Sequence, residues 1–175
     1  MIKKYINAFS LVELMIVIVI LTILALSATS FLKSDKYNQE NQIEEIFDLI
    51  KKSRISAFQN NENVIICSSS DGVSCSSNSL WTDHLVIAFI SKDGTSNYDS
   101  QNDSMIGSVE SPNSSYYYEW SSFPNASFIR IASKGDGMNG VLTFCQDNQA
   151  YKKMLINFKG NISIQDSTDN NLCTA

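Results

Sequence analysis

The chain begins with a long apolar run. From Phe9 to Leu32, 24 positions are predominantly apolar, and the one carboxylate among them is Glu13. A helix of about 20 residues already crosses the hydrocarbon of a bilayer. The pattern therefore predicts an apolar membrane-spanning helix over residues 9–32. The short segment before it, residues 1–8, carries Lys3 and Lys4.

Residues 33–59 have a different pattern, in which apolar positions recur at helical spacing and charged residues fill the other face. No proline occurs between Phe9 and Phe58. We therefore expect the apolar helix to continue into an amphipathic helix, with at most a bend near Ser34-Asp35. The apolar stripe of this second part comprises Ile43, Ile46, Phe47, Ile50, Ala57 and Phe58.

From residue 60 onward, short runs rich in β-formers predict strands. Turn signals separate these runs at Asp71-Gly72, Asp93-Gly94, Asn139-Gly140 and Lys159-Gly160. We expect the polar stretch 97–113 to be a surface loop. The fold class is α+β, with the N-terminal helix packed on an antiparallel sheet in a β-rich head over residues 60–175. The predicted strands are 64–67, 84–90, 115–120, 128–132, 141–144, 154–158 and 162–164.

The start of the apolar run carries a specific motif. Ala8-Phe9-Ser10-Leu11-Val12-Glu13-Leu14-Met15 resembles the class III signal of type IV prepilins, in which a small residue precedes Phe-(Thr/Ser)-Leu-(Ile/Val)-Glu. This resemblance implies that a prepilin peptidase cuts between Ala8 and Phe9 and that the new amine of Phe9 is methylated. The family usually has glycine where this chain has Ala8, and alanine is also small.

The charges near the motif agree with that resemblance. Before cleavage, Lys3 and Lys4 hold the N-terminus on the cytoplasmic face of the bacterial inner membrane, so that the head lies in the periplasm. After cleavage, the Glu13 carboxylate of one subunit can pair with the Phe9 amine of its neighbour in a pilus or pseudopilus. Buried charges tolerate apolar surroundings only when paired. The alternative is an ordinary membrane anchor that tolerates a glutamate.

The charge balance limits the classes of partner. The chain has 13 Lys and Arg residues against 18 Asp and Glu residues, and loss of residues 1–8 would leave 11 against 18. This balance argues against a generally basic surface for nucleic acids or anionic membranes. One domain of ordinary size fits beside the anchor in 175 residues.

Four cysteines lie in the part of the chain that export would place in an oxidising compartment, where disulfides persist. Four thiols allow three pairings. We favour a Cys67–Cys75 disulfide, which closes a hairpin around Asp71-Gly72, and a Cys145–Cys173 disulfide, which ties the C-terminal tail to a strand. Zinc sites use cysteines two to four residues apart, and these spacings differ. We therefore predict no metal site.

The head resembles a narrower group. The segments Arg54-Ile55-Ser56-Ala57, Val64-Ile65-Ile66-Cys67 and Gly140-Val141-Leu142-Thr143-Phe144-Cys145 are similar to those of the GspH/FimT/FimU group of minor pilins and pseudopilins. This resemblance implies a pilin fold and a structural subunit of a type IV pilus that helps initiate or cap filament assembly. The implied partners are other major and minor pilins and the prepilin peptidase.

Two other functions of this group stay open. A type II secretion pseudopilin of the GspH type would be chemically almost identical. Some FimT-type minor pilins bind DNA for natural competence through a Gly-Arg-x-Arg segment, whereas this chain has Gly160-Asn161-Ile162-Ser163 there, without either arginine. Candidate phosphate contacts are Lys152, Lys153 and Lys159. The structural alternative is that these lysines protect a strand edge from aggregation.

The apparent enzymatic motifs lack the sequence context that their chemistry needs. Residues 135–140 match G-x-G-x-x-G, but a strand follows where a dinucleotide-binding motif needs a helix, so we interpret them as a turn. His84 is the single histidine, and no Gly-x-Ser-x-Gly elbow accompanies it. We therefore expect no catalytic residue and no cofactor.

Overall fold

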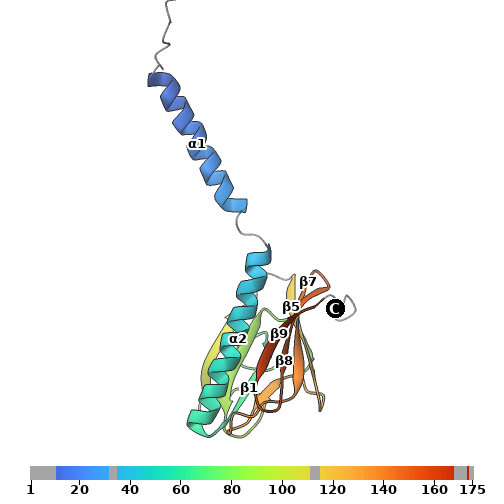
Figure 1. The fold of residues 1–175 in the computed structure, drawn as a ribbon. Helices are drawn as coiled ribbons and strands as arrows, with labels where there is room; N and C mark the ends of the chain where they lie inside the picture. Colours follow the sequence, from blue (N-terminus) through green and yellow to red (C-terminus); the bar gives the residue numbers. More distant parts are fainter. Residues whose placement is uncertain (1–10, 32–34, 111–114, 168–172, 174–175) are drawn as a thin grey trace, which may run out of the picture. The chain divides into compact units, whose positions relative to one another are not determined.

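The computed structural model describes residues 11–31, 35–110, 115–167 and 173. The chain divides into two compact units, residues 1–40 and 41–175. The first unit contains helix α1 (Leu11–Phe31), and helix α2 (Asp35–Asn60) belongs to the second unit from Asn41 onward (Figure 1). Residues 32–34, where we expected the bend, lie outside the described residues. Among the described helices, none combines the length and hydropathy that crossing a membrane requires.

A left-handed cap ends α2. Asn61 has a φ of 55°, and the N–H of Glu62 donates to the carbonyl of Ala57 at 3.2 Å. Asparagine is one of the few residues other than glycine that adopts this conformation readily. The Asn60-Asn61 pair therefore ends the helix and directs the chain into the first strand.

The head contains two antiparallel sheets rather than the single sheet that we expected. The four-stranded sheet has the order β4-β3-β1-β6, and the five-stranded sheet has the order β2-β5-β7-β8-β9. The first sheet contains β1 (Asn63–Ser69), β3 (Leu85–Ser91), β4 (Ser104–Glu110) and β6 (Ile129–Ile131). The second contains β2 (Leu80–Trp81), β5 (Tyr116–Ser122), β7 (Gly140–Gln146), β8 (Gln149–Ile156) and β9 (Ile162–Asp166).

One hydrophobic core joins α2 to both sheets. The predicted stripe of α2 is buried at Ile43, Ile46, Ile50 and Ala57, and Leu49 adds to it. Phe58 does not belong to the stripe, because 71% of its side chain is exposed. The sheets contribute Val64, Ile66, Trp81, Val86, Ala88, Val109, Tyr118, Trp120, Ile129, Ile131, Leu142, Phe144, Met154 and Ile156.

Each sheet also has an outer face with its own small cluster. On the four-stranded sheet, Ile65, Cys67, Ile87 and Phe89 are buried beneath Cys75, Leu85, Tyr98 and Phe128. On the five-stranded sheet, the outer cluster contains Tyr117, Cys145, Ala150 and Cys173, with Leu80 beside it. Both disulfides therefore lie on outer faces, where they hold irregular chain against a sheet.

Strand β4 was not predicted, because residues 97–113 were expected to form a loop. β4 is an edge strand in which only Val109 is buried, and Gly107 interrupts its pattern. An edge strand that exposes most of its side chains lacks the apolar alternation by which strands are recognised. β8 was also placed wrongly, since it begins at Gln149 and ends at Ile156. The first half of β8 contains Lys152 and Lys153, so it lacks the apolar pattern from which a strand is predicted.

The turn predicted at Asn139-Gly140 is wrong, because Gly140 is the first residue of β7. A Cβ on Gly140 would lie 2.4 Å from the Trp120 ring and 2.6 Å from the carbonyl oxygen of Ser121. Glycine is therefore needed there for close packing rather than for a turn. The turn lies earlier, where the N–H of Gly135 donates to the carbonyl of Ala132 at 2.7 Å.

The other three predicted turns are confirmed by the positive φ of Gly72, Gly94 and Gly160. The β7–β8 connection was missed. Its two residues, Asp147 and Asn148, have φ of 49° and 63°. A two-residue hairpin with both φ positive is a type I′ turn, for which aspartate and asparagine are suited.

Candidate functional site

Glu13 lies in the first turn of α1 and is the only charged residue of that helix. A carboxylate in this position interacts favourably with the partial positive charge of a helix N-terminus. That interaction alone could account for Glu13 in an isolated helix. It does not account for the apolar surroundings, since the residues on both sides of it are Val12 and Leu14.

The side chains of residues 11–24 are all exposed. Among the large apolar ones, the exposed fraction ranges from 46% at Val17 to 75% at Leu11. Covering apolar surface with another apolar surface or with lipid is favourable by about 25 cal/mol for each Å². The predicted cleavage pair, Ala8 and Phe9, lies outside the described residues, so the structure gives no geometry for that step.

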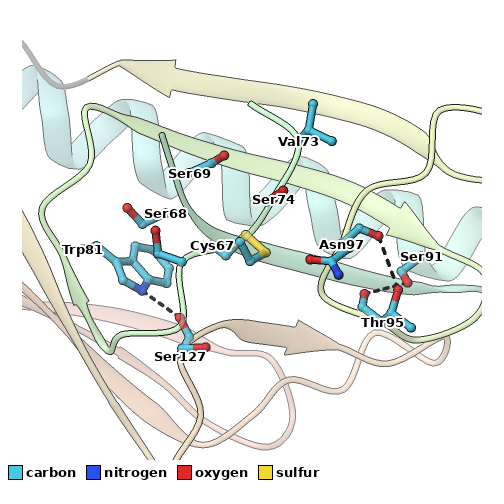
Figure 2. The surroundings of a disulfide bond; sticks show 12 residues. Cys67, Ser68, Ser69, Val73, Ser74, Trp81, Ser91, Thr95, Asn97 and Ser127 are labelled. Atoms are coloured by element: carbon cyan, nitrogen blue, oxygen red, sulfur yellow. Dashed lines mark hydrogen bonds between the residues drawn. A yellow bond between two sulfur atoms is a disulfide. The ribbon is translucent and has the colours of Figure 1, made fainter. Parts of the chain in front are cut away.

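The head contains two disulfides, Cys67–Cys75 and Cys145–Cys173. These are the two pairs that we favoured from the sequence. Figure 2 shows Cys67 on a strand of the four-stranded sheet, with Ser74 and Asn97 close to the bond. The N–H of Tyr98 donates to the carbonyl of Val73 at 3.0 Å, so the disulfide-bonded loop also holds the chain near residue 97.

Asp71 organises the loop that the first disulfide closes. Its carboxylate accepts hydrogen bonds from the N–H groups of Ser74 at 2.7 Å and Val73 at 2.8 Å, and from the Ser69 hydroxyl at 3.0 Å. These bonds, with that of Ser74 the strongest influence, lower the pKa of Asp71 to about 2. Hydrogen bonds to a carboxylate favour its charged form.

The Asp71 carboxyl should titrate at about pH 2 in the folded chain. Because its pKa is lower in the folded than in the unfolded state, the stabilisation is complete above the ordinary value of about 4. It is lost as the pH falls through about 2. The ¹³C shift of the carboxyl carbon, followed by NMR between pH 5 and pH 1.5, checks this. A midpoint near the ordinary value would show that the three hydrogen bonds are absent in solution.

Arg54 connects α2 with two loops, the β6–β7 connection and the β8–β9 turn. Its guanidinium donates to the carbonyls of Gly135 at 3.1 Å, Gly160 at 2.9 Å and Lys159 at 2.6 Å. Gly160 has a φ of 69°, and a Cβ there would lie 2.9 Å from Nε of Arg54. Glycine at position 160 and arginine at position 54 therefore form one structural unit, which fixes the β8–β9 turn against the helix.

Replacement of Arg54 by methionine should destabilise the head by about 1.5–3 kcal/mol, the range for hydrogen bonds to a charged group. Methionine keeps an apolar stem but removes all the donors. Chemical denaturation of the full chain in detergent measures the change. The matched control is Lys52→Met, an exposed position on the same helix, where we expect a change within about 0.5 kcal/mol. Equal effects of the two substitutions would contradict the anchoring role.

Comparison with known proteins identifies the family. Residues 3–29 match the model of the prokaryotic N-terminal methylation motif. Residues 42–160 match the model of the type II transport protein GspH. The chain belongs to the GspH family. It is a minor pilin or minor pseudopilin, because the methylation motif and the GspH domain occur together in it. Among curated protein sequences, none matches it.

Solved structures show the same fold at low sequence identity. The type IV minor pilin FimU of Pseudomonas aeruginosa is 10% identical with a TM-score of 0.57, and the match covers 77% of this chain and 93% of FimU. The minor pseudopilin EpsH of the Vibrio cholerae type II secretion system is 10% identical with a TM-score of 0.53. That match covers 78% of this chain and 99% of EpsH. The pilin fold is thereby confirmed.

In this GspH-family head, the three lysines considered for DNA do not form one surface. Lys152 and Lys153 are consecutive in β8 and point to opposite faces of the sheet. Lys152 also forms an ion pair with Asp166 of β9. Lys159 lies in the β8–β9 turn, where its carbonyl accepts a hydrogen bond from Arg54. The three lysines are close in sequence, which suggested a basic patch, but the strand geometry places them on different surfaces.

Sequence reasoning missed the anchoring role of Arg54 and the buried pair of Gln42 and Tyr118. The Tyr118 hydroxyl donates to Oε1 of Gln42, and Nε2 of Gln42 donates to the carbonyl of Glu110 at 3.2 Å. A glutamine within the apolar side of α2 was the available signal for this pair. In the described part of the chain, no group of three or more His, Cys, Asp and Glu residues could hold a metal ion.

Proposed function

We propose that the chain is a structural minor pilin of a type IV pilus that helps to initiate or cap filament assembly, and that it is not an enzyme. The precursor is a single-pass protein of the bacterial inner membrane, held by residues 9–32, with its head in the periplasm. Prepilin peptidase cuts between Ala8 and Phe9, and the Phe9 amine is methylated. The mature chain then enters the filament beside other major and minor pilins.

The observation that carries this proposal is the surface of α1. From Leu11 to Leu24 its apolar side chains are exposed, and its single charge lies in the first turn. Packing among helices of the same kind covers the apolar surface, but it also takes Glu13 out of water. A carboxylate moved into apolar surroundings needs a paired cation. A free amine on Phe9 of a neighbouring subunit supplies that cation, and it exists only after cleavage.

A deletion experiment tests the proposal. Removal of the gene should reduce the number of surface filaments counted by electron microscopy, and a plasmid copy of the gene should restore them. Secretion of proteins through a type II system should be unchanged in the same strain. The type II pseudopilin alternative predicts the reverse, with normal filaments and lost secretion, so the two measurements together separate the two assignments.

DNA binding is a second candidate function, and the cations around Arg54, Lys159 among them, support it better than Lys152 and Lys153 do. The Arg54 guanidinium donates to the carbonyls of Gly135, the residue after Lys134, and of Lys159, so both lysines belong to segments that contact Arg54. Lys51 lies one helical turn before Arg54, and the exposed ring of Phe58 lines a cavity with Arg54 and Lys134. Cations beside an exposed aromatic ring suit single-stranded DNA.

Charge reversal tests this second function. In the full chain, Lys51→Glu with Lys134→Glu should weaken the retention of a fluorescent single-stranded oligonucleotide by at least about tenfold at low salt, since phosphate contacts dominate such binding. The matched control is Lys152→Glu with Lys153→Glu, because those residues lie away from Arg54. Equal losses in both double variants, or no retention by the unmodified chain, would reject the surface around Arg54 as a DNA site.

A further inference from the structure

Among the described residues, the outer face of the five-stranded sheet has its buried cluster at one end and a cavity at the other. In the cluster, Cys173 packs against Tyr117, Cys145 and Ala150. Toward the opposite end, Val141 of β7 lies beside Leu155 of β8, which in turn lies beside Ser163 of β9. Val141 and Leu155 are half-buried, and a cavity of about 400 Å³ opens over this part of the sheet. Its volume lies within the range of small-molecule sites, about 300–1,000 Å³.

Three exposed asparagines, Asn139, Asn157 and Asn161, line this cavity. The Asn161 N–H donates to Oδ1 of Asn157 at 2.9 Å, which orients the Asn157 amide and leaves its NH₂ group free to donate. Within the described residues, the side chains of Asn139 and Asn161 make no hydrogen bond to the protein. Each amide offers both donors and an acceptor. We call this site the asparagine-rimmed cavity.

No charged side chain is among the described residues that line the cavity. An ionic ligand would therefore lose hydration there without gaining an ion pair, which is costly. The lining combines an apolar floor with neutral groups that donate and accept. A pyranose ring has the matching surface, since its C–H groups form an apolar face and its hydroxyls lie around the edge.

An exposed aromatic residue is hydrogen-bonded through its backbone to a residue of this rim. The N–H of Phe123 donates to the carbonyl of Asn139 at 3.2 Å, and 80% of the Phe123 side chain is exposed. A phenyl ring gives a flat apolar surface on which a second sugar unit can lie.

We propose that the asparagine-rimmed cavity binds a neutral saccharide of one or two hexopyranose units. Val141 and Leu155 contact the apolar face of the sugar, and the amides of Asn139, Asn157 and Asn161 bind its hydroxyls. The inference goes beyond the filament role and does not depend on it. A chain that enters filaments normally without binding sugar would refute only this inference.

The test uses the full ¹⁵N-labelled chain in a zwitterionic detergent without a sugar headgroup, titrated with maltose and with cellobiose. We expect a saturable shift of the side-chain amide signals of Asn139, Asn157 and Asn161, with a dissociation constant in the millimolar range for at least one disaccharide. Asn161→Ala, and separately Asn139→Ala, should weaken binding by about tenfold, the effect of about 1.4 kcal/mol. Both positions are exposed, so the fold should persist.

The matched control is Asn125→Ala. Asn125 lines another neutral cavity, of about 450 Å³, whose lining has Leu80 as its only large apolar side chain. We expect this variant to bind like the unmodified chain. The inference is overturned if neither sugar gives a saturable shift, if the control loses binding equally, or if glucose 6-phosphate binds more tightly than the neutral sugars.

Discussion

Replacement of Glu13 by alanine should lower incorporation of the chain into filaments by at least about 100-fold while leaving membrane insertion intact. Loss of one partner of a buried ion pair costs about 3–5 kcal/mol, because the other charge stays buried and unpaired. In the proposed filament, the charge left behind is the amine of Phe9 on a neighbouring subunit. Insertion does not need Glu13, since removal of a carboxylate makes the helix more apolar. Immunoblots of sheared filaments and of membranes measure the two quantities.

Two further variants sharpen this experiment. Glu13→Asp keeps the charge on a shorter side chain and should recover part of the incorporation. Glu44→Ala removes an exposed carboxylate from α2 and should incorporate normally. If Glu13→Ala entered filaments as well as Glu44→Ala, the pairing role would be wrong, and the interaction of Glu13 with its own helix N-terminus would be the better explanation.

Loss of the Cys145–Cys173 disulfide should destabilise the head more than loss of the Cys67–Cys75 disulfide. The separations along the chain are 28 and 8 residues. On the loop-entropy model, these closures correspond to about 3.6 and about 2.5 kcal/mol. Double serine variants of the full chain, unfolded with denaturant in detergent, should therefore differ by about 1 kcal/mol.

The same pair of variants separates stability from assembly. Both double serine variants should lose filament incorporation only as far as their folded fraction falls, since all four cysteines belong to the head and none to α1. The control is the unmodified chain, unfolded with denaturant in the presence of a reductant. Because the reductant breaks both disulfides, this chain should be less stable than either variant. A larger loss on removal of Cys67–Cys75 would show that packing around the Asp71 loop outweighs chain entropy.

The sequence predicted the elements whose apolar patterns are strong. α2 and strands β1, β3 and β7 bury continuous or periodic apolar residues, so their positions followed from the pattern. β4 and the first half of β8 escaped because edge position and half-exposed lysines remove that pattern. The division into two sheets depends on which strands pair, and strand pairing is a tertiary property that a single sequence does not display.

The candidate sites divide in the same way. The methylation motif and the cysteines were predictable because their chemistry depends on residue identity and order. The role of Arg54 was not, because it binds carbonyls about 80 and 105 residues away, and any residue can supply a carbonyl. The asparagine-rimmed cavity likewise combines residues of β7, β8 and β9 that become neighbours only through the register of the sheet.

Mass spectrometry of the N-terminal peptide, from the chain purified out of sheared filaments, tests the central claim most directly. The claim requires a free amine on Phe9 that the Glu13 carboxylate of an adjacent subunit can meet. We predict a peptide that begins at Phe9 and carries one methyl group on its amine. A peptide that begins at Met1, or absence of the chain from the filament fraction, would contradict the account.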